Sequence, residues 1–184
     1  MSRKKKIISL FLVLLLIIVI CKFESINSLS KELDGITIKN SIAMRKYSQE
    51  DIINASTYIV EATVVKNFKS TVEDIYFPVT NEICKSIVTD TKVKVDNVIK
   101  GNILEDNIII RSNIGKVKST ILISDEEATY QKNEKVLLFL NDDGLSNTYR
   151  LVKFIYGKYV YSYDDEYFND YSGYTVKISD LISN

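Results

Sequence analysis

The chain has no histidine and no tryptophan, and its 184 residues include one proline and two cysteines. The lack of histidine excludes Ser-His-Asp triads and metal sites with histidine ligands. Cys21 and Cys84 are too few for a zinc ribbon or a disulfide framework. No pair of carboxylates and no Ser-Lys spacing stands out as a catalytic set. We therefore expect a protein that is not an enzyme, with no catalytic residues, no metal site and no cofactor.

The charge balance excludes another class of protein. Lys plus Arg and Asp plus Glu both number 24, but residues 1–30 hold five of the basic residues and only one of the acids. The rest of the chain therefore has four more acids than basic residues. Nucleic-acid binding depends on an electropositive surface, so we expect no nucleic-acid partner. The hydrophobic fraction of 46% is that of a globular protein and excludes a disordered chain.

The N-terminus carries the pattern of an export signal. A basic segment, Met1–Lys6, precedes an apolar run, Ile7–Cys21, that contains no charge. A basic start followed by an apolar run of this length is typical of a secretory signal, and basic residues stay on the cytoplasmic side of a membrane. We therefore expect residues 1–21 to form a signal peptide or membrane-anchor helix and residues 22–184 to lie outside the cytoplasm.

The sequence leaves open three fates of this segment. Small residues at Ser28-Leu29-Ser30 would suit a cleaved signal peptide and a secreted protein. Ile18-Val19-Ile20 before Cys21 resembles a lipobox, with Cys21 as the lipidated residue, although Ile20 stands where a small residue is expected. A retained anchor would place Lys22 and Glu24 at the outer interface of the cell membrane. In the anchored and lipidated cases, the membrane is a partner of the N-terminal segment.

The rest of the chain divides into a linker and a domain rich in strands. Residues 22–46 are polar and predict an extracytoplasmic linker, with a short strand at Ile36–Ile38. Residues 47–184 predict one domain that begins with a short helix, because Ser48 can cap it and Glu50 and Asp51 suit its N-terminal end. We expect this helix to end near Asn54.

The strand pattern predicts an all-β barrel or sandwich rather than a parallel α/β fold, because the segments are short and long crossover helices are missing. We expect a β-bulge at Asp96-Asn97, an irregular insert over Asn67–Lys85, and a central strand at Lys135–Leu140. Two hairpins are expected: Asn107–Ile114 with Val117–Ile123, and Tyr149–Tyr156 with Tyr159–Tyr163. The remaining segments are strands at Thr57–Lys66 and Ser86–Ile99, and a short strand or closing helix at Thr175–Ile182.

Several of these segments carry a family resemblance. Val98–Gly101 reads Val-Ile-Lys-Gly, Asn133–Leu140 reads Asn-Glu-Lys-Val-Leu-Leu-Phe-Leu, and Gly157–Tyr159 reads Gly-Lys-Tyr. Over Ile52–Tyr159 the chain resembles the barrels of netrin-type and tissue-inhibitor-of-metalloproteinase-type domains and their bacterial exported relatives. The resemblance implies an all-β fold, a small OB-like Greek-key barrel with one or two short helices.

The same resemblance sets limits on function and makes a local prediction. The metalloproteinase inhibitors use an N-terminal cysteine and a disulfide framework, and this sequence lacks that framework, so inhibition is not implied. Asn133 stands at a turn position where the family has glycine. Asparagine tolerates positive φ, so we expect the turn to form.

Tyr156–Tyr174 is the most unusual segment, with seven tyrosines and four acids. Tyr159, Tyr161 and Tyr163 are two residues apart and would share one side of a strand, so we predict them as the contact face for a ligand. The alternative is that these rings cover the barrel and bind nothing. Outside the segment, we expect Cys84 to be free or packed as a small hydrophobic residue.

The predicted function is therefore a non-enzymatic, membrane-tethered or secreted extracytoplasmic domain. It would bind a protein, peptide or glycan ligand. The alternative is a structural or accessory subunit of a cell-envelope complex.

Overall fold

The computed structural model describes residues 36–40, 46–77 and 81–182. They fall almost entirely into one compact unit, Thr37–Val117 and Ile121–Asn184, and the account below concerns that unit. The signal or anchor segment, Cys21 and most of the linker lie outside the described residues. Within the linker range, the expected short strand is present as β1, Thr37–Asn40.

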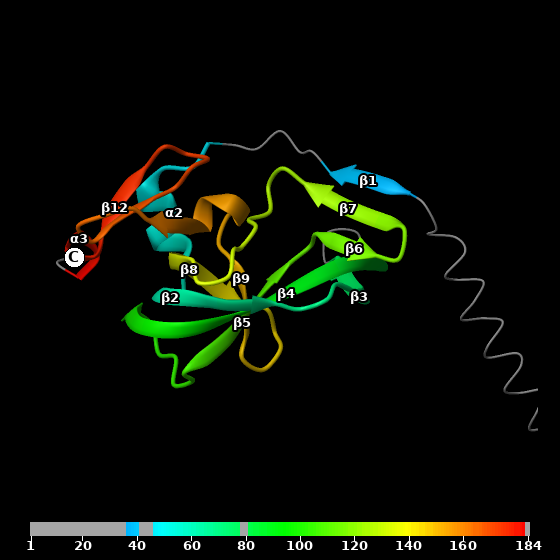
Figure 1. Ribbon diagram of the computed structural model, residues 1–184, viewed down its shortest axis with the longest axis horizontal. Helices are drawn as coiled ribbons and strands as arrows, with labels where there is room; N and C mark the ends of the chain where they lie inside the picture. Colours follow the sequence, from blue (N-terminus) through cyan, green and yellow to red (C-terminus); the bar gives the residue numbers. More distant parts are fainter. Residues whose placement is uncertain (1–35, 41–45, 78–80, 183–184) are drawn as a thin grey trace, which may run out of the picture. The chain divides into compact units, whose positions relative to one another are not determined.

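Five strands form a closed barrel (Figure 1). The ring runs β2–β4–β5–β9–β8 and closes where β8 pairs with β2. Neighbours are antiparallel except for β5 and β9, which are parallel. The prediction of an all-β barrel is confirmed. The bounds are β2 Tyr58–Asn67, β4 Glu82–Lys100, β5 Asn107–Ser112, β8 Lys135–Asp142 and β9 Thr148–Leu151.

The long strand β4 bends at the expected bulge. Val95 pairs with Ala62 and Asn97 pairs with Glu61, so Asp96 has no partner in the ladder. A bulge adds bend and twist to a strand, which lets β4 follow the curved barrel wall. The carboxylate of Asp96 accepts a hydrogen bond from the Thr63 hydroxyl at 2.5 Å.

The barrel interior is filled by aliphatic side chains from alternate positions of its strands. The central position expected for Lys135–Leu140 is confirmed, since Val136 to Leu140 are all fully buried. The barrel core comprises Val60, Ala62, Val64, Val93, Ile103, Ile108, Ile110, Ala128, Tyr130, Val136, Leu138, Leu140 and Tyr149.

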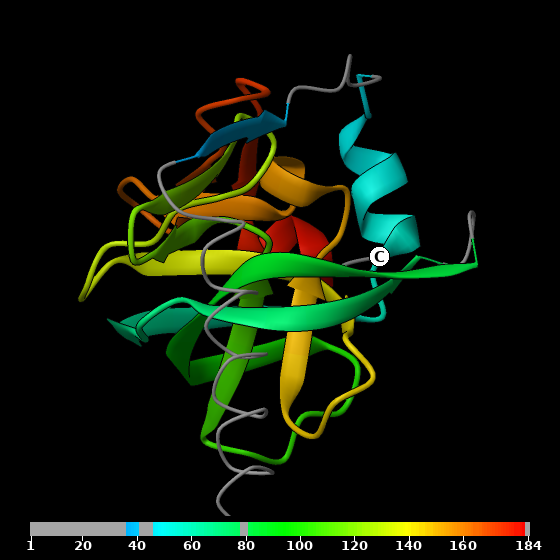
Figure 2. The same cartoon turned by 90° about the vertical axis from the view of Figure 1, so that its right-hand side faces the viewer.

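A second core, which we call the outer core, lies on the other side of β8 and β2. Figure 2 shows helix α2 above the barrel strands, and in Figure 1 it lies beside the C-terminal elements. The outer core comprises Ile52, Ile59, Leu137, Phe139, Val152, Tyr156, Tyr159, Tyr167 and Val176. The elements that build it around the barrel are α2 Gln49–Ala55, the 3-10 turn η1 Phe154–Gly157, β10 Lys158–Tyr161, β11 Glu166–Phe168, β12 Thr175–Lys177 and α3 Ile178–Ile182.

Two local predictions are confirmed. Ser48 caps α2, and its side chain and that of Asp51 form a reciprocal capping box. Asn133 has φ of 66°, so the turn does form with asparagine in the left-handed region. At the C-terminus, Thr175–Ile182 forms both a strand, β12, and a helix, α3.

The predicted hairpin of Tyr149–Tyr156 with Tyr159–Tyr163 is wrong. Strands β9 and β10 do not pair with each other but lie one after the other along β8, joined by η1. Gly157 allows this crossing, because a β-carbon there would come 2.6 Å from the carbonyl oxygen of Val152. The chain thus leaves the barrel at η1, and β10 begins an extension that continues into β11 and β12.

The prediction of an irregular insert over Asn67–Lys85 is also wrong. β3, Thr71–Phe77, pairs with the first part of β4. Val72 and Ile83 on these strands are exposed, so the alternation that reveals a half-buried strand is missing.

The partner predicted for Asn107–Ile114 is wrong as well. β7, Thr120–Ser124, pairs with β6, Gly115–Val117, and with β1, while β5 pairs with β4 and β9. The prediction chose the next segment along the chain as the partner of β5. In the structure β5 pairs with β9 instead, because this pairing closes the barrel.

Candidate functional site

The three tyrosines predicted as a contact face differ widely in how exposed they are. Tyr159 is only 1% exposed, and its ring packs on Phe139 with the ring centroids 5.3 Å apart. Tyr161 is 38% exposed, and Tyr163, at 67%, lies beyond the end of β10. The prediction is wrong for Tyr159 because β10 has one face on the outer core, so the ring is buried there. A ligand-binding role of Tyr161 and Tyr163 stays a prediction.

Four other tyrosines do gather around a cavity of about 290 Å³. Tyr47 precedes α2, Tyr156 comes from η1, and Tyr171 and Tyr174 lie in the loop between β11 and β12. We call this cavity the tyrosine pocket; its lining is Lys46, Tyr47, Tyr156, Tyr171, Ser172 and Tyr174. Three of its tyrosines belong to the tyrosine-rich segment, but none of them is among the three predicted as a contact face.

The rings of the tyrosine pocket are held edge to face. The centroids of Tyr47 and Tyr156 are 5.5 Å apart with an angle of 86° between the planes. Those of Tyr156 and Tyr171 are 5.0 Å apart at 82°. Aromatic rings favour this T-shaped arrangement. Tyr156 is buried, while Tyr171 and Tyr174 are 48% and 39% exposed, so the pocket has a buried floor and accessible walls.

Asn169 fixes the loop that carries two of these walls. Its amide nitrogen donates hydrogen bonds to the carbonyl oxygens of Ile155 at 2.9 Å and Lys158 at 2.8 Å. Its amide oxygen accepts hydrogen bonds from the backbone nitrogens of Tyr171 at 3.1 Å and Ser172 at 2.7 Å. Asn169 is 1% exposed, so one buried amide ties the loop to the chain around η1.

The electrostatic setting of the tyrosine pocket is neutral to basic. Lys46 lines it, and the ammonium of Lys153 lies 5.0 Å from the ring centroid of Tyr47. Burial, followed by the nearby phenols of Tyr171, Tyr174 and Tyr47, raises the pKa of Tyr156. The Tyr156 phenol is therefore uncharged near neutral pH and able to donate a hydrogen bond.

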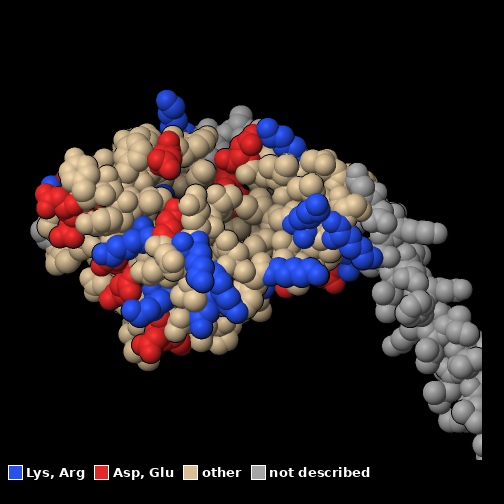
Figure 3. Space-filling model, viewed as in Figure 1, with Lys and Arg blue, Asp and Glu red and all other residues tan. Residues whose placement is uncertain are grey.

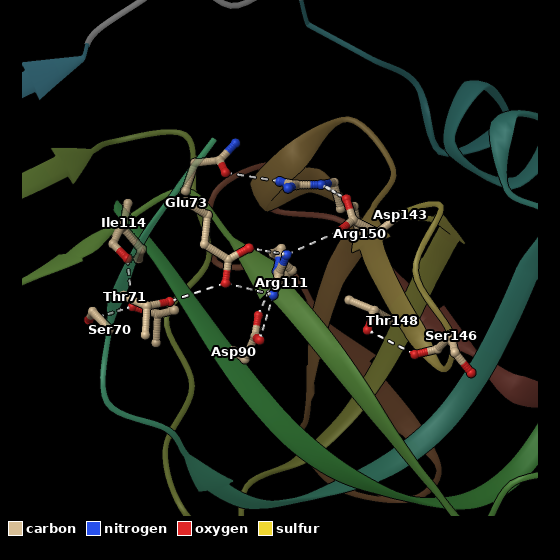
Figure 4. Close-up of polar contacts among 12 residues, drawn as sticks. Ser70, Thr71, Glu73, Asp90, Arg111, Ile114, Asp143, Ser146, Thr148 and Arg150 are labelled. Atoms are coloured by element: carbon tan, nitrogen blue, oxygen red, sulfur yellow. Dashed lines mark hydrogen bonds and ion pairs between the residues drawn. The ribbon is translucent and has the colours of Figure 1, made fainter. Parts of the chain in front are cut away.

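A second polar cluster surrounds Arg111 on the outer face of the barrel (Figure 4). Arg111 makes two hydrogen bonds of 2.8 Å to the Asp90 carboxylate and further bonds to Glu73 at 2.9 and 3.4 Å. The Asp143 carboxylate lies 3.8 Å away and pairs with Arg150.

This cluster is structural rather than ligand-binding. Asp90 and Glu73 engage the guanidinium from both sides, so Arg111 has little capacity left to bind an anion. The ion pairs instead tie β3 to β4, β5 and the turn after β8. Elsewhere on the surface, Figure 3 shows basic and acidic side chains mixed over one face.

The structure also bears on the predictions about metal ligands, the two cysteines and a membrane-spanning helix. Within residues 36–40, 46–77 and 81–182, no group of three or more Cys, Asp or Glu side chains is placed to share a metal ion. Cys84 is free and exposed, so the alternative of a packed thiol is wrong. None of the helices in the described part of the chain has the length and apolar character needed to cross a bilayer. Cys21 lies outside the described residues.

Comparison with known sequences adds no family. Neither a protein-family model nor a curated protein matches this chain. The candidate site is therefore defined by its geometry alone. The signal that could have found it is the pair Tyr171 and Tyr174 around Gly173, since a turn there brings both rings to one side. Tyr47 carried no such signal, because in the sequence it precedes all the barrel strands and the tyrosine-rich segment follows them.

Proposed function

We propose that this protein is a non-enzymatic, extracytoplasmic binding domain that holds a glycan in the tyrosine pocket. The observation that carries the proposal is the set of four tyrosine rings around a cavity of about 290 Å³. A pocket lined by aromatic rings with a few polar groups is the usual form of a small-ligand site. The N-terminal apolar run would tether the domain to the cell membrane or direct its secretion.

A sugar matches the chemistry of this lining. The faces of Tyr171 and Tyr174 can stack on the C–H face of a pyranose ring, and phenol and Ser172 hydroxyls can bond its hydroxyls. A cationic ligand fits less well, because the ammonium groups of Lys46 and Lys153 would repel it. Neutral and acidic sugars are therefore the favoured class of ligand.

The strand order supports an OB-like assignment for the barrel. Numbered along the chain, the five barrel strands close in the order 1-2-3-5-4-1, and the third and fifth are parallel. A five-stranded Greek-key barrel is the OB architecture, and domains of this architecture commonly bind oligosaccharides or oligonucleotides. We propose on this basis that the resemblance to netrin-type domains reflects a shared fold.

The test is a set of matched tyrosine variants of the full chain. Binding to a panel of neutral and acidic oligosaccharides, including peptidoglycan fragments, is measured by calorimetry. Tyr171→Ala and Tyr174→Ala should each weaken binding about tenfold or more, because each removes an aromatic wall. Tyr161→Ala and Tyr163→Ala are the controls, since both change exposed tyrosines that do not line the pocket.

The controls also separate the two tyrosine hypotheses. A loss of binding in the Tyr161 and Tyr163 variants alone would contradict the tyrosine pocket and restore those residues as the contact face. The absence of binding to every glycan, together with binding to a peptide library, would replace the glycan by a peptide ligand.

A further inference from the structure

Two lysines give the tyrosine pocket its positive charge. Lys46 lines the cavity, and the ammonium of Lys153 lies 5.0 Å from the ring centroid of Tyr47. Neither lysine makes an ion pair in the part of the chain that the structure describes. By contrast, Lys158 and Lys177 pair with glutamates at 2.8 and 3.0 Å. The charges of Lys46 and Lys153 are therefore available to a ligand.

Carboxylates are missing from the described lining of the tyrosine pocket. Asp164 and Asp165 of the tyrosine-rich segment form the turn between β10 and β11. Glu166 pairs with Lys177 at 3.0 Å, and Asp170 lies in the loop between β11 and β12 but does not line the cavity. The pocket is thus basic, although the segment that supplies three of its rings is acidic.

The backbone is strained where it carries one of these lysines. Lys153 and Phe154 are consecutive residues with φ of 51° and 58°, in the left-handed region. Glycine adopts this conformation readily, whereas a residue with a β-carbon is destabilised by it. Strained positions of this kind gather at functional sites. The strain at Lys153 therefore agrees with a role of its side chain at the pocket.

The volume of the tyrosine pocket fits one sugar ring. A cavity of about 150 Å³ accepts benzene, with about six non-hydrogen atoms, so a cavity of about 290 Å³ accepts roughly twice as many. A hexuronic acid ring has about that size. Its carboxylate extends from the edge of the ring, whereas stacking on tyrosine uses the C–H face. Aromatic walls and a lysine can therefore bind the same sugar.

From these observations we propose that the tyrosine pocket selects an acidic sugar, whose carboxylate is bound by Lys46. Lys153 adds to the positive potential at the pocket and holds the ring of Tyr47 through a cation–π contact. This inference rests on the proposed glycan function and narrows it to uronic acids and similar carboxylated sugars. A charge-assisted hydrogen bond is roughly twice as strong as a neutral one, so the carboxylate decides between sugars of the same shape.

The test compares each acidic sugar with its own neutral form. The probes are oligouronides of the gluco, galacto and manno series, and the same oligouronides with methyl-esterified carboxylates. Binding to the full chain is measured by calorimetry at low and at high salt. The free acid should bind about tenfold more tightly than its ester at low salt, which corresponds to one charge-assisted hydrogen bond. High salt screens the lysine charges and should reduce this ratio to about twofold.

Variants that change one charge assign the preference to the lysines. Lys46→Gln should reduce the acid-to-ester affinity ratio to about twofold, while Lys46→Arg keeps the charge and should retain most of the ratio. Lys153→Gln should lower the ratio about twofold, because this ammonium acts from a greater distance. Lys66→Gln is the matched control and should leave the ratio unchanged. Lys66 also lies over a ring, that of Phe68 at 4.3 Å, but does not line the pocket.

The variant Lys153→Gly separates binding from folding. Glycine adopts a φ of 51° without strain, so the urea midpoint of this variant should equal or exceed that of the parent. Its acid-to-ester ratio should fall as in Lys153→Gln. A lower midpoint with an unchanged ratio would contradict the role of Lys153 at the pocket.

The outcomes distinguish this inference from the glycan proposal. Equal affinity for acid and ester in every series that binds would overturn the inference and leave the glycan proposal standing. A preference for the acid that persists in Lys46→Gln would place the carboxylate away from Lys46 and overturn the assignment. If no oligouronide binds in either form, the acidic sugar is excluded, and the glycan proposal then depends on the neutral members of its own panel.

Discussion

The two faces of strand β8 differ in what covers them, although both are fully buried. Val136, Leu138 and Leu140 point into the barrel, and Leu137 and Phe139 point into the outer core. In a barrel with water outside, only one of these sets would be buried. Here the chain after β9 returns across the barrel wall and covers the second set. A strand that is apolar throughout therefore indicates a second layer.

The two cores also differ in composition. The barrel core is mostly aliphatic, whereas tyrosines make up much of the outer core. A tyrosine brings a hydroxyl that needs a partner or water, so tyrosines suit the boundary of a core. Tyr156 belongs to the outer core and also lines the tyrosine pocket. The pocket is thus the place where the outer core opens to solvent.

Truncating the two faces of β8 should cause the largest effects. Phe139→Ala should lower the free energy of unfolding by about 3–5 kcal/mol and Leu138→Ala by about 2–5 kcal/mol, since both leave a cavity in a packed core. Denaturant melts of both variants provide the measurement. Phe168→Ala, at a partly exposed position of β11, is the control and should cost much less.

A large difference between Leu138→Ala and Phe139→Ala would contradict the two-core arrangement. Such a contrast is expected of a barrel that is open to water on its outside, because neighbouring residues of a strand point to opposite faces. In this structure both side chains are 0% exposed.

Removing the amide of Asn169 should have the next largest effect. Asn169→Ala leaves buried backbone groups around η1 and the Tyr171 loop without partners, so we expect a loss of roughly 3–4 kcal/mol in unfolding free energy. Glycan affinity should fall as well, because the Tyr171 wall is no longer fixed. Asn169→Asp keeps an accepting oxygen but places a buried carboxylate against the carbonyl oxygens of Ile155 and Lys158, so near neutral pH it should be at least as destabilising as Asn169→Ala. A variant as stable as the parent would show that the loop is held by other contacts.

The sequence predicts the barrel better than it predicts the outer core. Period-two patterns and turn residues locate β2, β4, β5 and β8, and the apolar run of β8 predicts its central place. The outer core depends on distant segments, such as Ile52 of α2 and Tyr167 of β11, whose partners no local pattern specifies. Strands β9 and β10 both pair with the same edge of β8, one after the other. This arrangement also depends on tertiary packing, and the close approach at Gly157 allows it.

The same limit applies to the candidate site. Tyrosine enrichment identified the segment, but alternation along a strand selected Tyr159, Tyr161 and Tyr163. The fold buries Tyr159 and ends the strand at Tyr161, and it brings in Tyr47 from before the barrel. Which tyrosines meet depends on the turn at Gly173 and on Asn169, whose contacts only the folded chain reveals.

Alkaline pH should lower the free energy of unfolding through one buried tyrosine of the outer core, Tyr159. Burial raises the pKa of Tyr159 from 10.0 to about 12. The unfolded chain therefore ionises at this site first, so the stability linked to Tyr159 is complete below pH 10 and is lost as the pH rises to 12. The loss amounts to roughly 2–3 kcal/mol.

Tyr159→Phe removes this linkage. Its free energy of unfolding should fall less steeply between pH 10 and 12 than that of the parent, as measured by urea melts at each pH. Identical slopes for the two proteins would mean that the Tyr159 phenol ionises as freely in the folded chain as in the unfolded one.

The smallest expected effect concerns the cap of α2, whose buried side chain Ile52 packs in the outer core. The Ser48 hydroxyl accepts a hydrogen bond from the backbone nitrogen of Asp51 at 3.1 Å, and the Asp51 carboxylate accepts one from the backbone nitrogen of Ser48 at 2.9 Å. Ser48→Ala should cost about 1 kcal/mol, the usual contribution of an N-cap. Because α2 contributes Ile52 to the outer core alone, hydrogen exchange should accelerate in α2 while β4 and β5 stay protected. Ser179→Ala, at an exposed serine of α3, is the control. Faster exchange in β4 and β5 as well would mean that the two cores unfold as one unit.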